Sequence, residues 1–210
     1  SSIDASVISF KVKLAHAIKA YGYEPAWVKP IILRSPEHSR MKIENSPIDV
    51  EQLVTSSASC VIRAPAQYGL TCLGLRLCEI GAEQDVDRSW TIVDLNAIKP
   101  HAAVDHVQDQ ARLLWGEDRK PGVIVVDSFR RQLDRHRKIL QALKKAFPSA
   151  RFIVLETVEA ATLDLSVSPG LVELGDLETY YLWALERDGI RRIANSYAQD
   201  SEKCELMTRE

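Results

Sequence analysis

Short apolar runs alternate with amphipathic runs between residues 60 and 157, and this alternation constrains the fold more than any other feature. Strands that alternate with helices along a chain form parallel sheets with helices on both faces. The run GVIVVD is almost continuously β-branched, as expected of a strand buried on both faces. The sequence therefore predicts an α/β fold. The predicted strands are 60–63, 89–95, 122–127, 150–157 and 171–175, and the predicted helices are 70–82, 103–115 and 131–147.

The regions that flank the alternation have a different character. An N-terminal helix is predicted at 5–20, and a proline-rich stretch with a short strand at 31–33 follows it. After the fifth strand, apolar residues at helical spacing predict helices over 176–197, divided at Gly189. We therefore expect three parts. They are an N-terminal helix and linker (1–48), an α/β domain (49–175), and C-terminal helices (176–210) that lead to a further domain.

Composition limits the classes of partner. The formal net charge is −2, which disfavours a general affinity for nucleic acid or for an anionic membrane. No apolar run approaches the roughly 20 residues that a membrane span needs, and no signal peptide is recognisable. The four cysteines form no CxxC pair, which is typical of buried thiols in a reducing compartment. These features predict a cytoplasmic protein that contacts neither nucleic acid nor membrane.

The segment VIRAPAQYGLTC contains the main candidate site, because it leaves the first strand and opens a helix. This is the setting of the phosphate-binding pattern GxxxxGK[ST], in which backbone N–H groups at a helix N-terminus hold phosphate oxygens. Gly69 and Thr71 fit the pattern, whereas Ala64 and Leu70 replace its first glycine and its lysine. The candidate nucleotide-binding residues of this loop are Pro65, Ala66, Gln67, Tyr68, Gly69, Leu70 and Thr71.

Asp127 ends the buried strand GVIVVD, where an acidic side chain helps to hold Mg²⁺ beside the hydroxyl of a phosphate-binding loop. Thr71 and Asp127 are therefore the candidate ligands of Mg²⁺, if a nucleotide binds. No histidine or cysteine spacing indicates a site for another metal.

From about residue 48 to residue 197 the chain resembles the P-loop domain of STAND-type ATPases, which include NACHT and related AAA-like signalling domains. The resemblance depends on VIRAPAQYGLT, WTIVDL, GVIVVDSF, FPSARFIVLET and LVELGDLETYYLWALERDGIRRIANSY. It implies a three-layer α/β/α fold with a five-stranded sheet in the order 5-1-4-3-2, and ATP or ADP with Mg²⁺ as ligand. It also implies that Thr157, at the end of the fourth strand, senses the γ-phosphate.

The sequence departs from that family where phosphoryl transfer needs cations and an oriented water. Leu70 replaces the lysine, Gln67 replaces a frequent loop glycine, and no acid follows Asp127. We therefore expect neither catalytic residues nor a tightly bound triphosphate. The resemblance then implies a scaffold, oligomerisation or regulatory module of a larger signalling or defence protein. Its partners would be other domains of the same longer chain or further copies of it.

Two alternatives remain open at this point. The first is an ATP/ADP-binding switch that uses another cation, such as Arg63, Arg130, Arg131 or an arginine of a neighbouring molecule. The second is a Rossmann-like small-molecule enzyme, in which Asp94 near the end of the second strand would bind a ribose. Against the second, GLTCLG does not match the GxGxxG fingerprint. The basic run 129–138 is interpreted as a solvated helix face.

Overall fold

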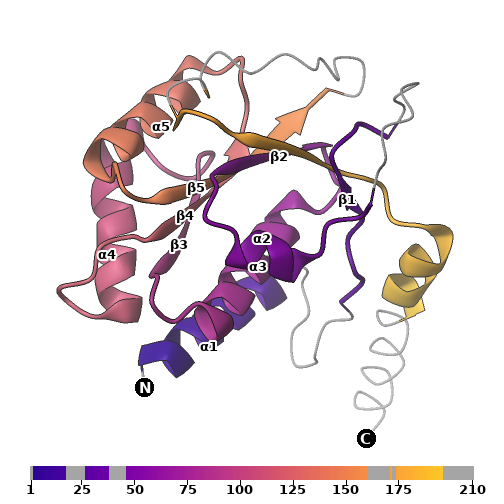
Figure 1. Ribbon diagram of the computed structural model, residues 1–210, viewed down its shortest axis with the longest axis horizontal. Helices are drawn as coiled ribbons and strands as arrows, with labels where there is room; N and C mark the ends of the chain where they lie inside the picture. Colours follow the sequence, from indigo (N-terminus) through magenta and orange to yellow (C-terminus); the bar gives the residue numbers. More distant parts are fainter. Residues whose placement is uncertain (1, 18–26, 38–45, 160–170, 172–173, 196–210) are drawn as a thin grey trace, which may run out of the picture.

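The computed structural model describes residues 2–17, 27–37, 46–159, 171 and 174–195. Its strands alternate with helices as the sequence predicts (Figure 1). A further helical segment occupies 187–195. The strands are β1 (Ile32–Leu33), β2 (Cys60–Pro65), β3 (Trp90–Asp94), β4 (Val123–Phe129), β5 (Arg151–Val158) and β6 (Glu178–Leu182). The helices are α1 (Ser2–Ala17), α2 (Val50–Thr55), α3 (Leu70–Gln84), the 3-10 helix η1 (Pro100–Ala102), α4 (Ala103–Trp115) and α5 (Asp134–Ala146).

The six strands form one sheet in the order β1-β6-β2-β5-β4-β3. All neighbouring strands are parallel except β1, which is antiparallel to β6. The sheet therefore differs from the five-stranded one expected from the sequence. The short strand at its edge is added, and the last parallel strand is Glu178–Leu182 rather than 171–175.

The prediction of helices throughout 176–197 was wrong. Residues 178–182 form a strand, and Gly189 lies inside the helical segment 187–195 instead of interrupting a helix. The apolar residues of ETYYLW satisfy a helical spacing, but their tyrosines also favour a strand. Pairing with β2 on one side and β1 on the other decides between the two. Leu171 and Leu174, from the run predicted as a strand, are buried in the core.

Two apolar clusters cover the two faces of the sheet. Successive residues of β2 point to opposite faces of the sheet. Ile62 belongs to the cluster under α1 and α3, and Val61 belongs to the cluster under α5. Figure 1 shows α1 and α3 on one side of the sheet and α4 and α5 on the other. The sheet therefore has helices on both of its faces, as expected of the α/β class (Figure 1). We call its faces the α3 face and the α5 face.

Two glycines bring α3 close to the sheet. A Cβ atom on Gly74 would lie 2.6 Å from Leu155 Cδ1, and one on Gly81 would lie 2.2 Å from the Trp90 ring. A larger residue at either position would require these side chains to shift. The close approaches fix the helix over the strands, and so they fix the position of its N-terminal end. None of the described helices has both the length and the apolar character that a membrane span requires.

Candidate functional site

The loop between β2 and α3 is a short turn that leads from a strand end to the N-terminus of a helix. The strand ends at Pro65, the turn occupies 66–69, and Gly69 caps the helix that starts at Leu70. The φ angles are +70° at Gln67 and +87° at Gly69. A left-handed glutamine is uncommon and costs on the order of 1 kcal/mol or more. The unpaired N–H groups of the first helical turn make this end of α3 a favourable place for an anion.

The side chain of Leu70 is directed into the core. It is 8% exposed and belongs to the apolar cluster on the α3 face. The position that would carry the lysine of the pattern is therefore part of the core. Ala66, Gln67 and Gly69 are exposed.

Thr71 and Asp127, the two candidate ligands of Mg²⁺, lie in contact in the structure. Thr71 Oγ1 donates a hydrogen bond to Asp127 Oδ2 at 2.8 Å. Asp127 is 4% exposed, and its Oδ1 accepts a hydrogen bond from the Ser128 N–H at 2.8 Å. The β4–β5 register shifts between Val126 and Phe129, and Ser128 has a φ of +62°. Asp127 therefore lies in a bulge at the end of β4.

The electrostatics of Asp127 are unfavourable to its charge. Burial raises the pKa of the carboxyl above its ordinary value, and the nearby Asp94 raises it further. The hydrogen bonds from Thr71 and Ser128 lower the pKa, but they do not offset burial. A divalent cation beside this carboxylate would favour the charged form.

Asp94 lies beside the candidate site, although the sequence analysis considered it only as the ribose-binding acid of the dinucleotide alternative. It ends β3 directly beside Asp127 in the parallel register, and it is exposed. Its Oδ1 accepts a hydrogen bond from the Asn96 N–H at 2.9 Å. Only its position, at the end of a predicted strand, could have indicated from the sequence that Asp94 lies near Asp127. Oxygen donors of this kind suit Mg²⁺, although no group of three His, Cys, Asp or Glu with metal-site geometry occurs in the described segments.

Thr157 lies beside the start of the loop. It pairs with Ala64 in the β2–β5 register and is partly buried. Side chains alternate along a strand, and Leu155 of β5 belongs to the cluster on the α3 face. The side chain of Thr157, two residues later, therefore lies on the same face. The predicted sensor position is therefore next to the loop.

The candidate replacement cations are held elsewhere. Glu156 is fully buried, and its carboxylate accepts hydrogen bonds at 2.8 Å from Arg63 Nε and from Arg131 Nε. Arg63 follows Val61 by two residues on β2, and Glu156 follows Val154 by two residues on β5. Both valines belong to the cluster on the α5 face. Arg63 and Arg131 therefore meet Glu156 on the face opposite to Leu70.

The third candidate cation, Arg130, is exposed at the end of β4. Its backbone N–H donates a hydrogen bond to His136 Nδ1 at 3.2 Å. Burial lowers the pKa of this histidine, and the charges of Arg135 and Arg130 lower it further. His136 therefore acts as a neutral acceptor that holds the turn before α5, a role that the sequence did not reveal.

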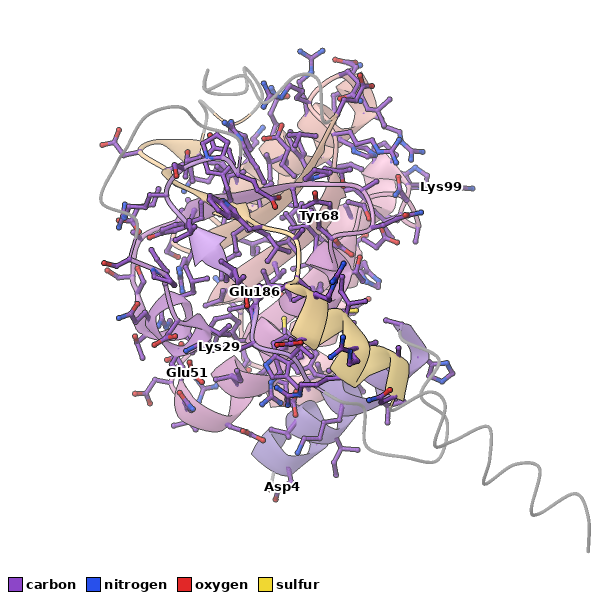
Figure 2. All side chains as sticks on the ribbon, turned by 90° about the vertical axis from the view of Figure 1, so that its right-hand side faces the viewer. Asp4, Lys29, Glu51, Tyr68, Lys99 and Glu186 are labelled. Carbon is purple, nitrogen blue, oxygen red and sulfur yellow. The ribbon has the colours of Figure 1, made fainter. Side chains whose placement is uncertain are left out.

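Tyr68 is directed toward residues that precede β2. Its side chain packs on the α3-face cluster. Its pKa is raised by burial, and also by the charge of Glu37 and a hydrogen bond to it. Figure 2 labels Tyr68, which lies on the same side of the molecule as Glu186. The bulky loop residue is thus held by a contact outside the loop.

No protein-family model matches the chain, and no curated protein matches it significantly. The functional assignment must therefore come from the residues and the geometry.

Proposed function

We propose that this chain contains a degenerate P-loop domain of a larger STAND-like signalling or defence protein, and that it acts as a non-catalytic scaffold, oligomerisation or regulatory module. The observation that carries the proposal is the hydrogen bond between Thr71 and Asp127 beside a buried Leu70. The loop, the hydroxyl and the strand-end acid remain together, while the charged group that meets the phosphates is replaced by a core residue.

The order of the parallel strands supports this proposal. When β1 is set aside, the neighbours are β6, β2, β5, β4 and β3, which is fifth, first, fourth, third and second along the chain. This partial order agrees with the one that the resemblance implies, although the fifth parallel strand is Glu178–Leu182 rather than 171–175 and the whole sheet has six strands. The candidate loop follows β2, a central strand, and the candidate acid ends β4, two strands away.

Electrostatics support the absence of hydrolysis. A charge-assisted hydrogen bond contributes about 1.5–3 kcal/mol, and Leu70 offers none to a triphosphate. Arg63 and Arg131 already bind Glu156 on the opposite face of the sheet. Releasing either one would leave the buried Glu156 with only part of its charge compensation, which is costly.

Calorimetry with ATP-Mg and ADP-Mg tests the proposal. We expect no binding tighter than about 10 μM, which corresponds to roughly −7 kcal/mol, and no turnover of ATP. The variant Leu70→Lys restores the charge at the N-terminus of α3, and we expect it to gain affinity for ATP-Mg. Leu113→Lys is the matched control, because Leu113 on α4 is 84% exposed and distant in sequence from the loop. Steady turnover by the unmodified protein that Asp127→Asn abolishes would contradict the proposal.

One observation favours a second candidate, a nucleotide-binding switch whose cation comes from a neighbouring molecule. Gln67 keeps a left-handed backbone, and strain of this kind persists mainly where function requires the conformation. The switch predicts that ATP-Mg or ADP-Mg binds more tightly than about 10 μM. It also predicts that affinity rises with protein concentration, which a monomeric scaffold does not.

A further inference from the structure

Residues 27–37, which we call the strap, connect the phosphate-loop region with the C-terminal part of the described chain. Within the strap, β1 pairs with β6, and the Trp183 N–H donates to the Ile31 carbonyl at 2.9 Å. Trp183 Nε1 donates to the Ser35 carbonyl at 2.8 Å. The strap is therefore attached to β6 and to the residue that follows it by successive hydrogen bonds.

The C-terminal end of the strap joins two distant segments through one carboxylate. Glu37 Oε2 accepts a hydrogen bond from the Ala184 N–H at 3.3 Å. The same side chain lies near the Tyr68 hydroxyl, and its charge raises the pKa of that group. Tyr68 is in the loop 66–69, whereas Ala184 lies three residues before the helical segment 187–195. Glu37 thus bridges the tip of the loop and the approach to that helical segment.

The N-terminal end of the strap makes a second pair of contacts to the same two regions. The guanidinium of Arg76 on α3 lies 5.5 Å from the centre of the Trp27 ring. A Cβ atom on Gly189 would be 2.9 Å from Val28 Cγ1, so the helical segment 187–195 packs closely on the strap. Both ends of the strap therefore link α3 or its preceding loop to residues 184–195.

We propose that the strap couples the conformation of the loop 66–69 to the helical segment 187–195, with Glu37 as the bridging group. A movement of Tyr68 weakens the hold of Glu37 on Ala184, and the start of the helical segment loosens. Coupling of this kind is a difference in free energy between states, so it acts in both directions. The proposal depends only on contacts within the chain and does not require that a nucleotide binds.

Hydrogen exchange of the nucleotide-free protein tests this coupling. Tyr68→Phe removes only the hydroxyl, and Glu37→Gln removes the charge while it keeps the shape. We expect amides in 183–190 to exchange about three- to tenfold faster in each variant, the effect of losing one hydrogen bond. Peptides of α5 keep their exchange rates. Asp109→Asn on α4 is the control, because it neutralises an exposed carboxylate whose ion pair with Arg112 lies within its own helix.

A double-mutant cycle completes the test. The combined variant should change exchange at 183–190 less than the product of the two single effects, because both changes break one bridge. Unchanged exchange in both single variants overturns the proposal. Independent, multiplicative effects also overturn it, as does an equal increase throughout the sheet, which indicates a purely structural role. If Tyr68→Phe does not fold, Glu37→Gln alone decides. The proposal then requires faster exchange in that variant at both 66–70 and 183–190.

Discussion

Thr71 on α3 and Asp127 on β4 are joined by a hydrogen bond of 2.8 Å, although 56 residues separate them in the chain. This bond joins the first turn of a helix to the end of a buried strand. The carboxylate of Asp127 accepts this bond from the Thr71 hydroxyl and a second one from the Ser128 N–H.

Replacing Thr71 by valine should destabilise the protein, because the buried Asp127 loses one of its two hydrogen-bond donors. We expect the free energy of unfolding to fall by about 1–2 kcal/mol at pH 7, measured by urea denaturation. The control is Thr55→Val on α2, whose exposed hydroxyl bonds only to carbonyls of its own helix. If both variants lose the same free energy of unfolding, the Thr71–Asp127 bond contributes no more to stability than a bond within an exposed helix.

The raised pKa of Asp127 gives a pH dependence with a definite sign. The folded protein binds the proton at a higher pH than the unfolded chain does. The contribution of this residue therefore becomes more favourable to folding as the pH falls through the folded pKa toward about 3.8. In Asp127→Asn this contribution should be absent. Unfolding curves of the two proteins between pH 7 and pH 4 measure it, and a difference that does not change with pH would contradict the assignment.

Removing the charge of Glu156 should have a large effect, since two arginines depend on this fully buried carboxylate. We expect Glu156→Gln to lower the free energy of unfolding by about 3–5 kcal/mol. Asp134→Asn serves as the comparison, because Asp134 pairs with Arg137 and Lys138 on an exposed helix face and should change stability little. Thermal and urea denaturation both report the difference.

Adding one methyl group at Gly81 should disturb the packing of α3 on the sheet. The new Cβ would lie 2.2 Å from the ring of the fully buried Trp90. Such overpacking costs about 1–3 kcal/mol, which outweighs the gain of up to about 1 kcal/mol that alanine gives in a helix. Gln84→Ala, at an exposed position of the same helix, should change stability only slightly. A stabilised Gly81→Ala variant would show that Trp90 moves at little cost.

The α/β class was predictable because local patterns determine it. The helix predicted at 103–115 has these bounds in the structure, and GVIVVD is buried as its composition indicates. Proximity of Thr71 and Asp127 also followed, since the carboxyl ends of parallel strands share one edge of a sheet.

Other features depend on partners that are distant in the sequence. The run ETYYL carries signals for both helix and strand, and only the pairing with β1 and β2 selects the strand. The ion pair between Arg63 and Glu156 joins residues 93 positions apart, so no spacing rule reveals it. The position of Asp94 beside Asp127 depends on the pairing of β3 with β4, which the sequence alone does not give.

The strand β1 has a consequence for how copies of this chain can meet. An uncovered parallel edge offers a row of free N–H and C=O groups that a foreign strand can extend. Here two residues of the same chain pair with Tyr181 and Leu182, and Trp183 adds a further bond to Ile31. This short cover makes continuous sheet growth across molecules unfavourable at that side. At that edge, self-association would then have to use side-chain surfaces, which a single charged substitution can disrupt.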